Sequence, residues 1–239
     1  MDGFVSSPTV IAVDGPSGSG KSSTARGVAA RLGIDYLDTG AMYRAVTWAL
    51  LDHGVDVDDP VTVAEAARSV AIDVGTDPAE PSIRANDVDV TAPVRAAEVT
   101  AAVSAVSAVP EVRALMVELQ RGIIAASTGI VVEGRDIASV VAPDAPVKVY
   151  LVADVGARAV RRTAELGGSG EEVDLTREDL DRRDRLDSSR EASPLVMADG
   201  ATVLDTTHLS LEEVIAAVVH LVEQTLDRGP ALEEDAHEA

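Results

Sequence analysis

The chain of 239 residues contains no cysteine and few aromatic residues. Because cysteine is absent, disulfides, zinc–thiolate centres and a cysteine nucleophile are excluded. Aromatic side chains make up 2% of the residues, and they are Phe4, Tyr36, Tyr43, Trp48 and Tyr150. Recognition of an aromatic base would therefore depend more on hydrogen bonds than on stacking.

Positive charge is scarce as well. Lysine and arginine total 20 against 41 aspartates and glutamates, so the formal net charge is −21. Affinity for a nucleic-acid backbone or an anionic membrane needs a surplus of cations, so we expect neither as a partner. Hydrophobic residues nevertheless make up 46% of the chain, which is enough for a core domain with insertions and excludes a disordered acidic protein.

Long apolar segments are also missing. No run of about 18 uncharged apolar residues occurs, which predicts no transmembrane helix. The first eight residues have neither a basic region nor an apolar stretch, so we expect no signal peptide and a cytoplasmic location.

Short apolar segments alternate with segments of helical spacing. The first kind predicts buried strands at 9–14, 34–38, 129–133, 146–152 and 201–205. The second kind predicts helices at 21–32, 41–53, 61–71, 94–108, 111–126, 155–166, 176–190 and 211–226. Residues 72–90 predict a small antiparallel meander. The alternation predicts an α/β fold, a three-layer sandwich with a five-stranded parallel sheet and its ligand site at the carboxyl edge of the strands.

A glycine-rich segment follows the first strand and matches G-x-x-x-x-G-K-[ST] at every defined position. In such a loop, backbone N–H groups surround phosphate oxygens, and the helix N-terminus adds its dipole. Lys21 can bridge the β- and γ-phosphates, and the Ser22 hydroxyl can bind Mg²⁺. The alternative is a turn without a ligand. The motif predicts nucleoside triphosphate binding, with ATP contacts from Gly15, Pro16, Ser17, Gly18, Ser19, Gly20, Lys21, Ser22 and Ser23.

Several classes of protein share this loop. The only other lysine, Lys148, lies between Val147 and Val149, so the guanine-reading N/T-K-x-D motif of GTPases is absent. Hexameric motor ATPases are usually larger and offer an arginine finger to a neighbour. The arginines scattered after the loop favour a kinase for a small phosphorylated or hydroxylated metabolite.

Four segments together resemble the bacterial cytidylate kinase family: Val13–Ser22, Leu37–Arg44 (LDTGAMYR), Glu133–Ile137 (EGRDI) and Arg183–Arg190 (RDRLDSSR). Their order and spacing agree from about residue 10 to residue 222. The resemblance implies a P-loop NTPase-type core of residues 1–59, 127–165 and 191–226, and a monomer. It also implies a monophosphate-binding insertion at 60–126 and a lid at 166–190. The composition of residues 227–239, with five acids and one arginine, separately predicts an acidic tail that we expect to be disordered.

The resemblance further implies transfer of the γ-phosphoryl group of Mg-ATP to CMP or dCMP. Catalysis then consists of positioning and charge neutralisation, for which arginine is suited because it binds phosphate bidentately. The implied catalytic residues are Lys21, Arg135, Arg162 and Arg158. The implied CMP-binding residues are Thr39, Tyr43, Arg44, Ser104, Arg113, Arg135, Asp136, Arg183, Asp187 and Arg190.

Each of these residues has an implied role. Arg44 and Arg135 bind the acceptor phosphate, while Arg113 and Asp136 read the acceptor and donor groups of cytosine, with Ser104 as a further contact. Arg183 and Asp187 hold the pentose, and Arg190 lies on the acceptor side. Thr39 and Tyr43 line the nucleoside, although the family often has serine where Thr39 stands.

Structural alternatives stay open for several of these residues. Arg44 could be a surface arginine, Arg135 could pair with a carboxylate, Ser104 could be an ordinary helix serine, and Tyr43 could only pack. The charged segment 183–190 could be a ladder of intrahelical ion pairs.

The lid and the metal site are the least determined by the sequence. Arginines flank the glycine run 167–170 on both sides, and Arg162 and Arg158 are our preferred phosphate ligands among them. Asp38 and Glu133 are candidates for ordering Mg²⁺ waters beyond Ser22, although much of the family has aspartate where Glu133 stands.

Two other functions remain open. Another small-molecule P-loop kinase, acting on UMP, AMP or a hydroxylated metabolite, fits less well because of the meander and the Arg113/Asp136 pair. A non-enzymatic nucleotide-dependent switch needs no second phosphate site, so the acceptor-side arginines argue against it.

Overall fold

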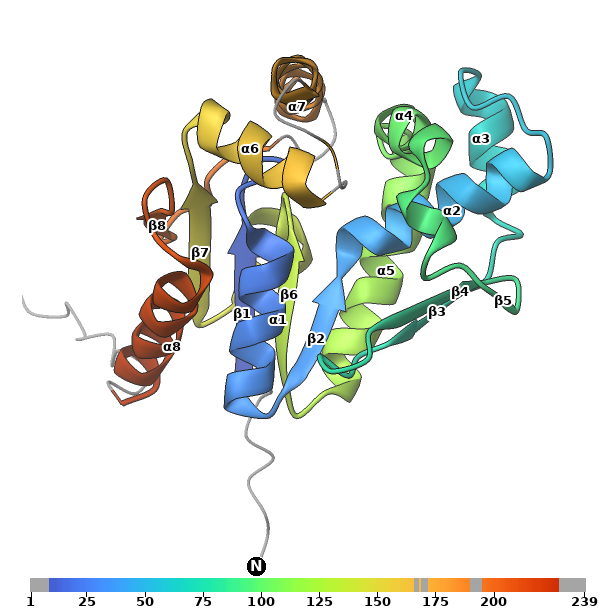
Figure 1. Cartoon of the computed structure of the whole chain (residues 1–239). Coiled ribbons are helices and arrows are strands. Elements are labelled where there is room, and N and C mark those ends of the chain that lie inside the picture. Colours follow the sequence, from blue (N-terminus) through green and yellow to red (C-terminus); the bar gives the residue numbers. More distant parts are fainter. Residues whose placement is uncertain (1–8, 166–167, 169–171, 190–194, 228–239) are drawn as a thin grey trace, which may run out of the picture.

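The computed structural model describes residues 9–165, 168, 172–189 and 195–227 (Figure 1). Its centre is a five-stranded, all-parallel sheet with the strand order β2-β6-β1-β7-β8. The strands are β1 (Thr9–Asp14), β2 (Asp35–Asp38), β6 (Gly129–Gly134), β7 (Val147–Val152) and β8 (Thr202–Asp205). The five predicted strands and their parallel arrangement are confirmed.

Helices cover both faces of this sheet, as a parallel sheet requires. Alternate residues of β1 point to opposite faces: Ile11 and Val13 pack in a cluster with α1 (Lys21–Leu32) and α8 (Leu211–Asp227). Val10 and Ala12 belong to the cluster on the other face, which includes α2 (Thr39–Asp52), α5 (Pro110–Ala126) and the one-turn π-helix η2 (Ile137–Val141). The predicted three-layer sandwich is therefore confirmed.

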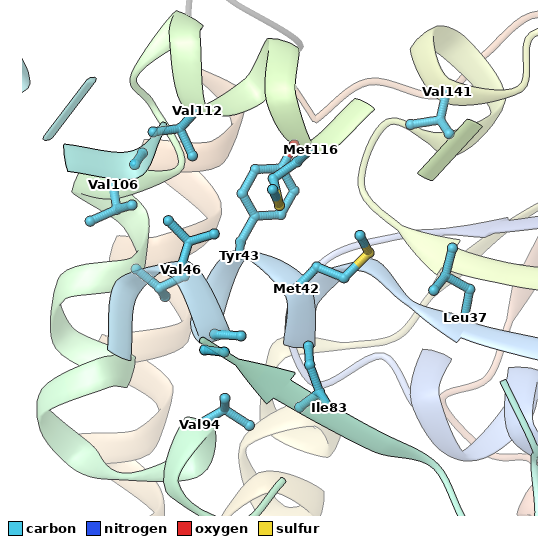
Figure 2. Packing of buried hydrophobic residues seen from close by; sticks show 14 of the residues in the cluster. Leu37, Met42, Tyr43, Val46, Ile83, Val94, Val106, Val112, Met116 and Val141 are labelled. Carbon is cyan, nitrogen blue, oxygen red and sulfur yellow. The ribbon is translucent and has the colours of Figure 1, made fainter. Parts of the chain in front are cut away.

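The segment between α2 and β6 builds on the second face. It comprises α3 (Pro60–Ala67), β3 (Ile72–Gly75), β4 (Ser82–Ala85), β5 (Val88–Asp89), η1 (Pro93–Arg95), α4 (Ala97–Val106) and α5. The three short strands form the predicted antiparallel meander in the order β3-β4-β5. Figure 2 shows that Ile83 of β4 and Met116 of α5 join Leu37 and Met42 in one continuous core.

Several helix boundaries differ from the predictions. Helix α3 ends at Ala67, four residues before the predicted 71. Two other differences have a clear physical reason. The predicted helix 94–108 is interrupted because Ala96 is extended (φ −60°, ψ 154°), which separates η1 from α4. Helix α2 begins at Thr39, two residues before the predicted start, because the Asp38 carboxylate accepts a hydrogen bond from the Ala41 N–H at 2.8 Å and caps the helix.

Helices α6 (Val155–Glu165) and α7 (Val173–Ser188) pack against each other above the carboxyl ends of the strands (Figure 1). The described part of the predicted lid is thus chiefly α7, which begins three residues before the predicted 176. The predicted disordered tail lies outside the described residues except for Asp227.

No single helix in the described ranges is long and apolar enough to cross a membrane. The pair α4 and α5 passes that test only jointly, and the two helices are bent by 101° at the break between them.

Candidate active site

A cleft of about 950 Å³ opens at the carboxyl edge of the sheet, where the ligand site was predicted. Its lining comes from the phosphate loop, the start of α2, the meander, α4, α5, the end of β6, and α7. It brings together most of the predicted site residues: Ser17, Gly18, Gly20, Lys21, Ser22, Ser23, Asp38, Thr39, Tyr43, Arg44, Ser104, Arg113, Glu133, Arg135, Asp136, Arg162, Arg183 and Asp187.

The phosphate loop has the backbone that its glycines allow. A Cβ atom at Gly15 would lie 2.2 Å from the backbone oxygen of Leu151, so only glycine fits there. Gly20, left-handed at φ 88°, is the N-cap residue of α1. The Lys21 ammonium donates to the Pro16 carbonyl at 2.7 Å. Burial, with the nearby charge of Arg135 as a second cause, lowers the pKa of Lys21 to about 8.

Glu133, at the end of β6, is buried beside the loop. The Ser22 hydroxyl donates to its Oε2 at 3.0 Å, and the Tyr36 hydroxyl donates to its Oε1 at 2.5 Å. Burial and the charge of Asp38 raise the pKa of Glu133 to about 7. Thr39, also buried, donates its hydroxyl to the Glu133 backbone carbonyl at 2.7 Å.

This arrangement fits Mg²⁺ bound together with a nucleotide. Hydroxyl and carboxylate oxygens are the hard ligands that Mg²⁺ prefers, and this ion usually keeps several waters and binds substrate phosphates. Within the described ranges, no group of three or more His, Cys, Asp or Glu side chains is placed to hold a metal ion. The nucleotide and water would therefore supply the other ligands. The residues that would hold it are Ser22 directly, with Glu133 and Asp38 through water.

In the lining of the cleft, Arg113 and Asp136 form a buried ion pair. Arg113 also donates to the Ser107 carbonyl at 3.2 Å and lies over the Tyr43 ring, 5.3 Å from its centroid. Tyr43 therefore packs in the core and contacts the site as well (Figure 2). The pair predicted to read one base is indeed adjacent, and Ser104 lines the same region.

Arg135 lies between the phosphate loop and α7. Its Nη1 donates to the Gly15 carbonyl at 3.1 Å, its Nη2 donates to Ser17 Oγ at 3.0 Å, and its Nε lies 2.6 Å from Asp187 Oδ2. Asp187 of α7 thus pairs with Arg135, which lies outside that helix. Arg135 therefore pairs with a carboxylate, as the structural alternative predicted, and it also lines the cleft.

Other cations converge on the same cleft. Arg44 donates to Thr100 Oγ1 at 3.0 Å, and burial, followed by the charge of Arg183, lowers the pKa of Arg44 to about 10. Burial, followed by the charge of Arg135, also lowers the pKa of Arg183. Arg162 joins them in the lining. So many cations in one partly buried cleft of an acidic protein indicate strongly anionic ligands.

Among the described residues, the predicted Gly15, Pro16, Ser19 and Arg158 are not in the lining of the cleft. Arg158 is buried behind the phosphate loop, where it donates to the Ser17 carbonyl at 2.8 Å and pairs with Asp184. Asp184 in turn accepts a hydrogen bond from the Ser17 N–H at 3.1 Å. Arg158 lines a separate open depression instead of the cleft. Arg190 lies outside the described residues.

The sequence analysis missed several residues of the cleft lining, including Arg26, Tyr36, Arg95 and Ser107. Arg26 follows Ser22 by one helical turn, a spacing that could have placed it on the same side of α1. It donates to the carbonyls of Pro78 and Ala79 at 2.6 and 2.9 Å, joining α1 to the loop between β3 and β4.

A phosphate loop at the edge of a parallel sheet, facing a second cationic subsite, defines a P-loop kinase of the nucleoside monophosphate type. Comparison with known sequences then gives the family. The profile of the cytidylate kinase family matches residues 11–224, and the chain belongs to that family.

Similar curated proteins agree with this assignment. Proteins named cytidylate kinase from Streptomyces griseus and Streptomyces coelicolor are 56% and 57% identical over 218 and 216 residues. These alignments cover 91% and 90% of this chain, and 94% and 93% of the relatives. A protein of the same name from Nocardia farcinica is 48% identical over 226 residues, covering 94% of this chain and 97% of the relative.

Proposed function

We propose that this protein transfers the γ-phosphoryl group of ATP to CMP or dCMP, giving ADP and CDP or dCDP. The observation that carries the proposal is the buried Arg113–Asp136 pair in the lining of the cleft. A carboxylate accepts from the exocyclic amine of cytosine, and a guanidinium donates to N3 or O2. Uracil offers an oxygen where cytosine offers the amine, so Asp136 would repel it.

The phosphate end of the cleft supports transfer between two bound nucleotides. Lys21 and the loop amides bind the donor phosphates, while Arg44 and Arg135 bind the acceptor phosphate, and Arg162 neutralises the group in transit. Because the acceptor phosphate is largely ionised at neutral pH, the step needs positioning and charge neutralisation more than a general base. Arg183 and Asp187 are proposed to hold the pentose, next to Thr39 and Tyr43.

Mg²⁺ is proposed as the metal, held by Ser22 and, through water, by Glu133 and Asp38. When bound, it would offset the negative charge of the phosphates. The hydrogen bond from Ser22 to Glu133 at 3.0 Å supports a shared role for these two side chains.

We also propose that the chain acts as a monomer in the cytoplasm, with residues 60–126 as the monophosphate-binding insertion and 166–190 as the lid. Closure of α7 over the cleft would exclude water, which otherwise competes with CMP for the phosphoryl group.

The test follows ADP formation with ATP and Mg²⁺ against a panel of CMP, dCMP, UMP, AMP and GMP. We expect turnover with CMP and dCMP. Turnover with AMP alone would indicate another kinase. ADP formation that does not depend on any monophosphate would indicate a nucleotide-dependent switch or an ATPase.

A further inference from the structure

Glu133 is held by two hydroxyl groups, one on each carboxylate oxygen. Ser22 donates to Oε2 from the phosphate loop side, and Tyr36 donates to Oε1 from β2. The carboxylate is buried, with 3% of the residue exposed. The proposed role toward Mg²⁺ uses only the first contact, so the second one needs its own explanation.

Tyr36 is placed for this contact by the sheet. Strands β2 and β6 pair in parallel with Tyr36 opposite Val131 and Asp38 opposite Glu133. Tyr36 and Val131 belong to the core cluster on the α1 side, and Glu133, two residues after Val131, points to the same side. The buried ring is therefore fixed by packing, and its hydroxyl is directed at a single carboxylate oxygen.

A glutamate needs such a partner because its side chain has three rotatable bonds, and one hydrogen bond from Ser22 leaves the carboxylate free to turn. A tyrosine supplies a rigid donor without adding charge. Asp38 already contributes a negative charge nearby, which a neutral hydroxyl does not alter.

We propose that Tyr36 is a positioning residue for Glu133: its hydroxyl holds Oε1 so that Oε2 stays toward Ser22 and the metal-binding side of the phosphate loop. The inference rests on the proposed role of Glu133 toward Mg²⁺. Partners that orient the ligands of a metal typically contribute one to two orders of magnitude in affinity.

The experiment measures binding of Mn²⁺, a paramagnetic substitute for Mg²⁺, by electron paramagnetic resonance with a non-hydrolysable ATP analogue bound. Tyr36→Phe removes only the hydroxyl and keeps the packed ring. We expect it to weaken Mn²⁺ binding about tenfold. The KM for CMP and the binding of the ATP analogue without metal should stay near wild type. Ser127→Ala, which also removes one hydroxyl but lies outside the cleft lining, is the control and should leave all three values unchanged.

Two Glu133 variants complete the design. Glu133→Asp withdraws the carboxylate from Tyr36, so adding Tyr36→Phe to it should cause little further loss, and the two effects should not be additive. Additive losses would mean that Tyr36 acts independently of Glu133 and would overturn the inference.

Glu133→Gln separates this inference from the proposal on which it rests. If Glu133→Gln weakens Mn²⁺ binding and Tyr36→Phe does not, Tyr36 is not a positioning residue and the inference fails alone. If Glu133→Gln binds Mn²⁺ as the wild type does, the metal role proposed for Glu133 fails as well. Thermal unfolding of each variant checks that the fold is kept.

Discussion

At the scale of single residues, the cleft contains a buried ion pair, Arg113 with Asp136. Arg113 and Asp136 are 4% and 5% exposed, so each depends on the other for compensation. Removing one partner of such a pair leaves an uncompensated buried charge, which is costly. Substitution of either residue is therefore expected to disturb the other as well.

The first prediction concerns this pair. Asp136→Asn places a donor where cytosine presents its own donor amine, and it leaves Arg113 unpaired. We expect kcat/KM for CMP to fall about 100-fold, with the KM for ATP nearly unchanged. Steady-state kinetics with each substrate varied in turn measure this. Asp144→Asn, an exposed carboxylate outside the cleft, is the control, and an equal loss for ATP would contradict the assignment.

The second prediction uses the raised pKa of Glu133, which burial shifts from 4.5 to about 7. The folded protein keeps this proton at pH values where the unfolded chain has lost it. The stabilisation from this group is therefore present below about pH 4.5 and is lost as the pH rises through about 7. Between pH 5 and pH 7.5 the contribution amounts to roughly 2 kcal/mol.

Urea unfolding at these two pH values, without nucleotide or metal, checks the prediction. The free energy of unfolding should fall more steeply with pH in the wild type than in Glu133→Gln, which has no proton to lose. Asp14, whose pKa burial raises to about 6, contributes in the same direction in both proteins and cancels in the comparison. Equal pH dependence in the two proteins would show that Glu133 is not titrating in this range.

At the scale of elements, α7 is joined to the phosphate loop in this structure. Asp184 on α7 accepts the Ser17 N–H at 3.1 Å and pairs with Arg158, which itself donates to the Ser17 carbonyl. Arg135 lies 4.0 Å from the same carboxylate. A negative group thus sits at the rim of a loop that is built to bind negative phosphates.

The third prediction follows from that contact. Asp184→Asn removes the negative charge but keeps a similar shape, so nucleotide phosphates no longer compete with a carboxylate. We expect affinity for a non-hydrolysable ATP analogue to rise about fivefold. Calorimetric titration without CMP measures it, and Glu178→Gln, an exposed acid on the same helix, is the control. Weaker binding would contradict this expectation and would show that the ion pair of Asp184 with Arg158 supports the phosphate loop in its binding conformation.

At the scale of the whole molecule, charge is segregated. The net charge is −21, yet the cleft collects Lys21, Arg44, Arg135, Arg162 and Arg183. An acidic protein with a cationic cleft disfavours long nucleic acids while short nucleotides can still enter. Arg135 is central to this arrangement because it contacts both the phosphate loop and α7.

The fourth prediction tests that central place. Arg135→Ala removes a charge from between the two substrates, so we expect kcat to fall at least about 100-fold. ATP binding should stay within a few-fold of wild type, because Lys21 and the loop amides remain. Single-turnover kinetics and equilibrium binding measure the two quantities separately. Loss of ATP binding with unchanged dependence on CMP would place Arg135 on the donor side.

The sequence by itself determined the parts of the protein that depend on local spacing. Alternating apolar segments predicted five strands, and the loop motif predicted a glycine-rich turn between a strand and a helix at the edge of the cleft. Even the Arg113/Asp136 pair was found, because the resemblance covered both positions. Helix ends were less certain: the extended Ala96 that splits the predicted helix 94–108 had no signal in the hydrophobic pattern.

Only the tertiary structure decided which side chains meet across the chain. Tyr36 and Glu133 are 97 positions apart, and Ser17 and Asp184 are 167 positions apart. No helical or strand period extends over such separations, so these contacts follow from strand order, register and the packing of α7. For the same reason, composition described the acidic character of the chain as a whole, while folding decided where its few cations gather.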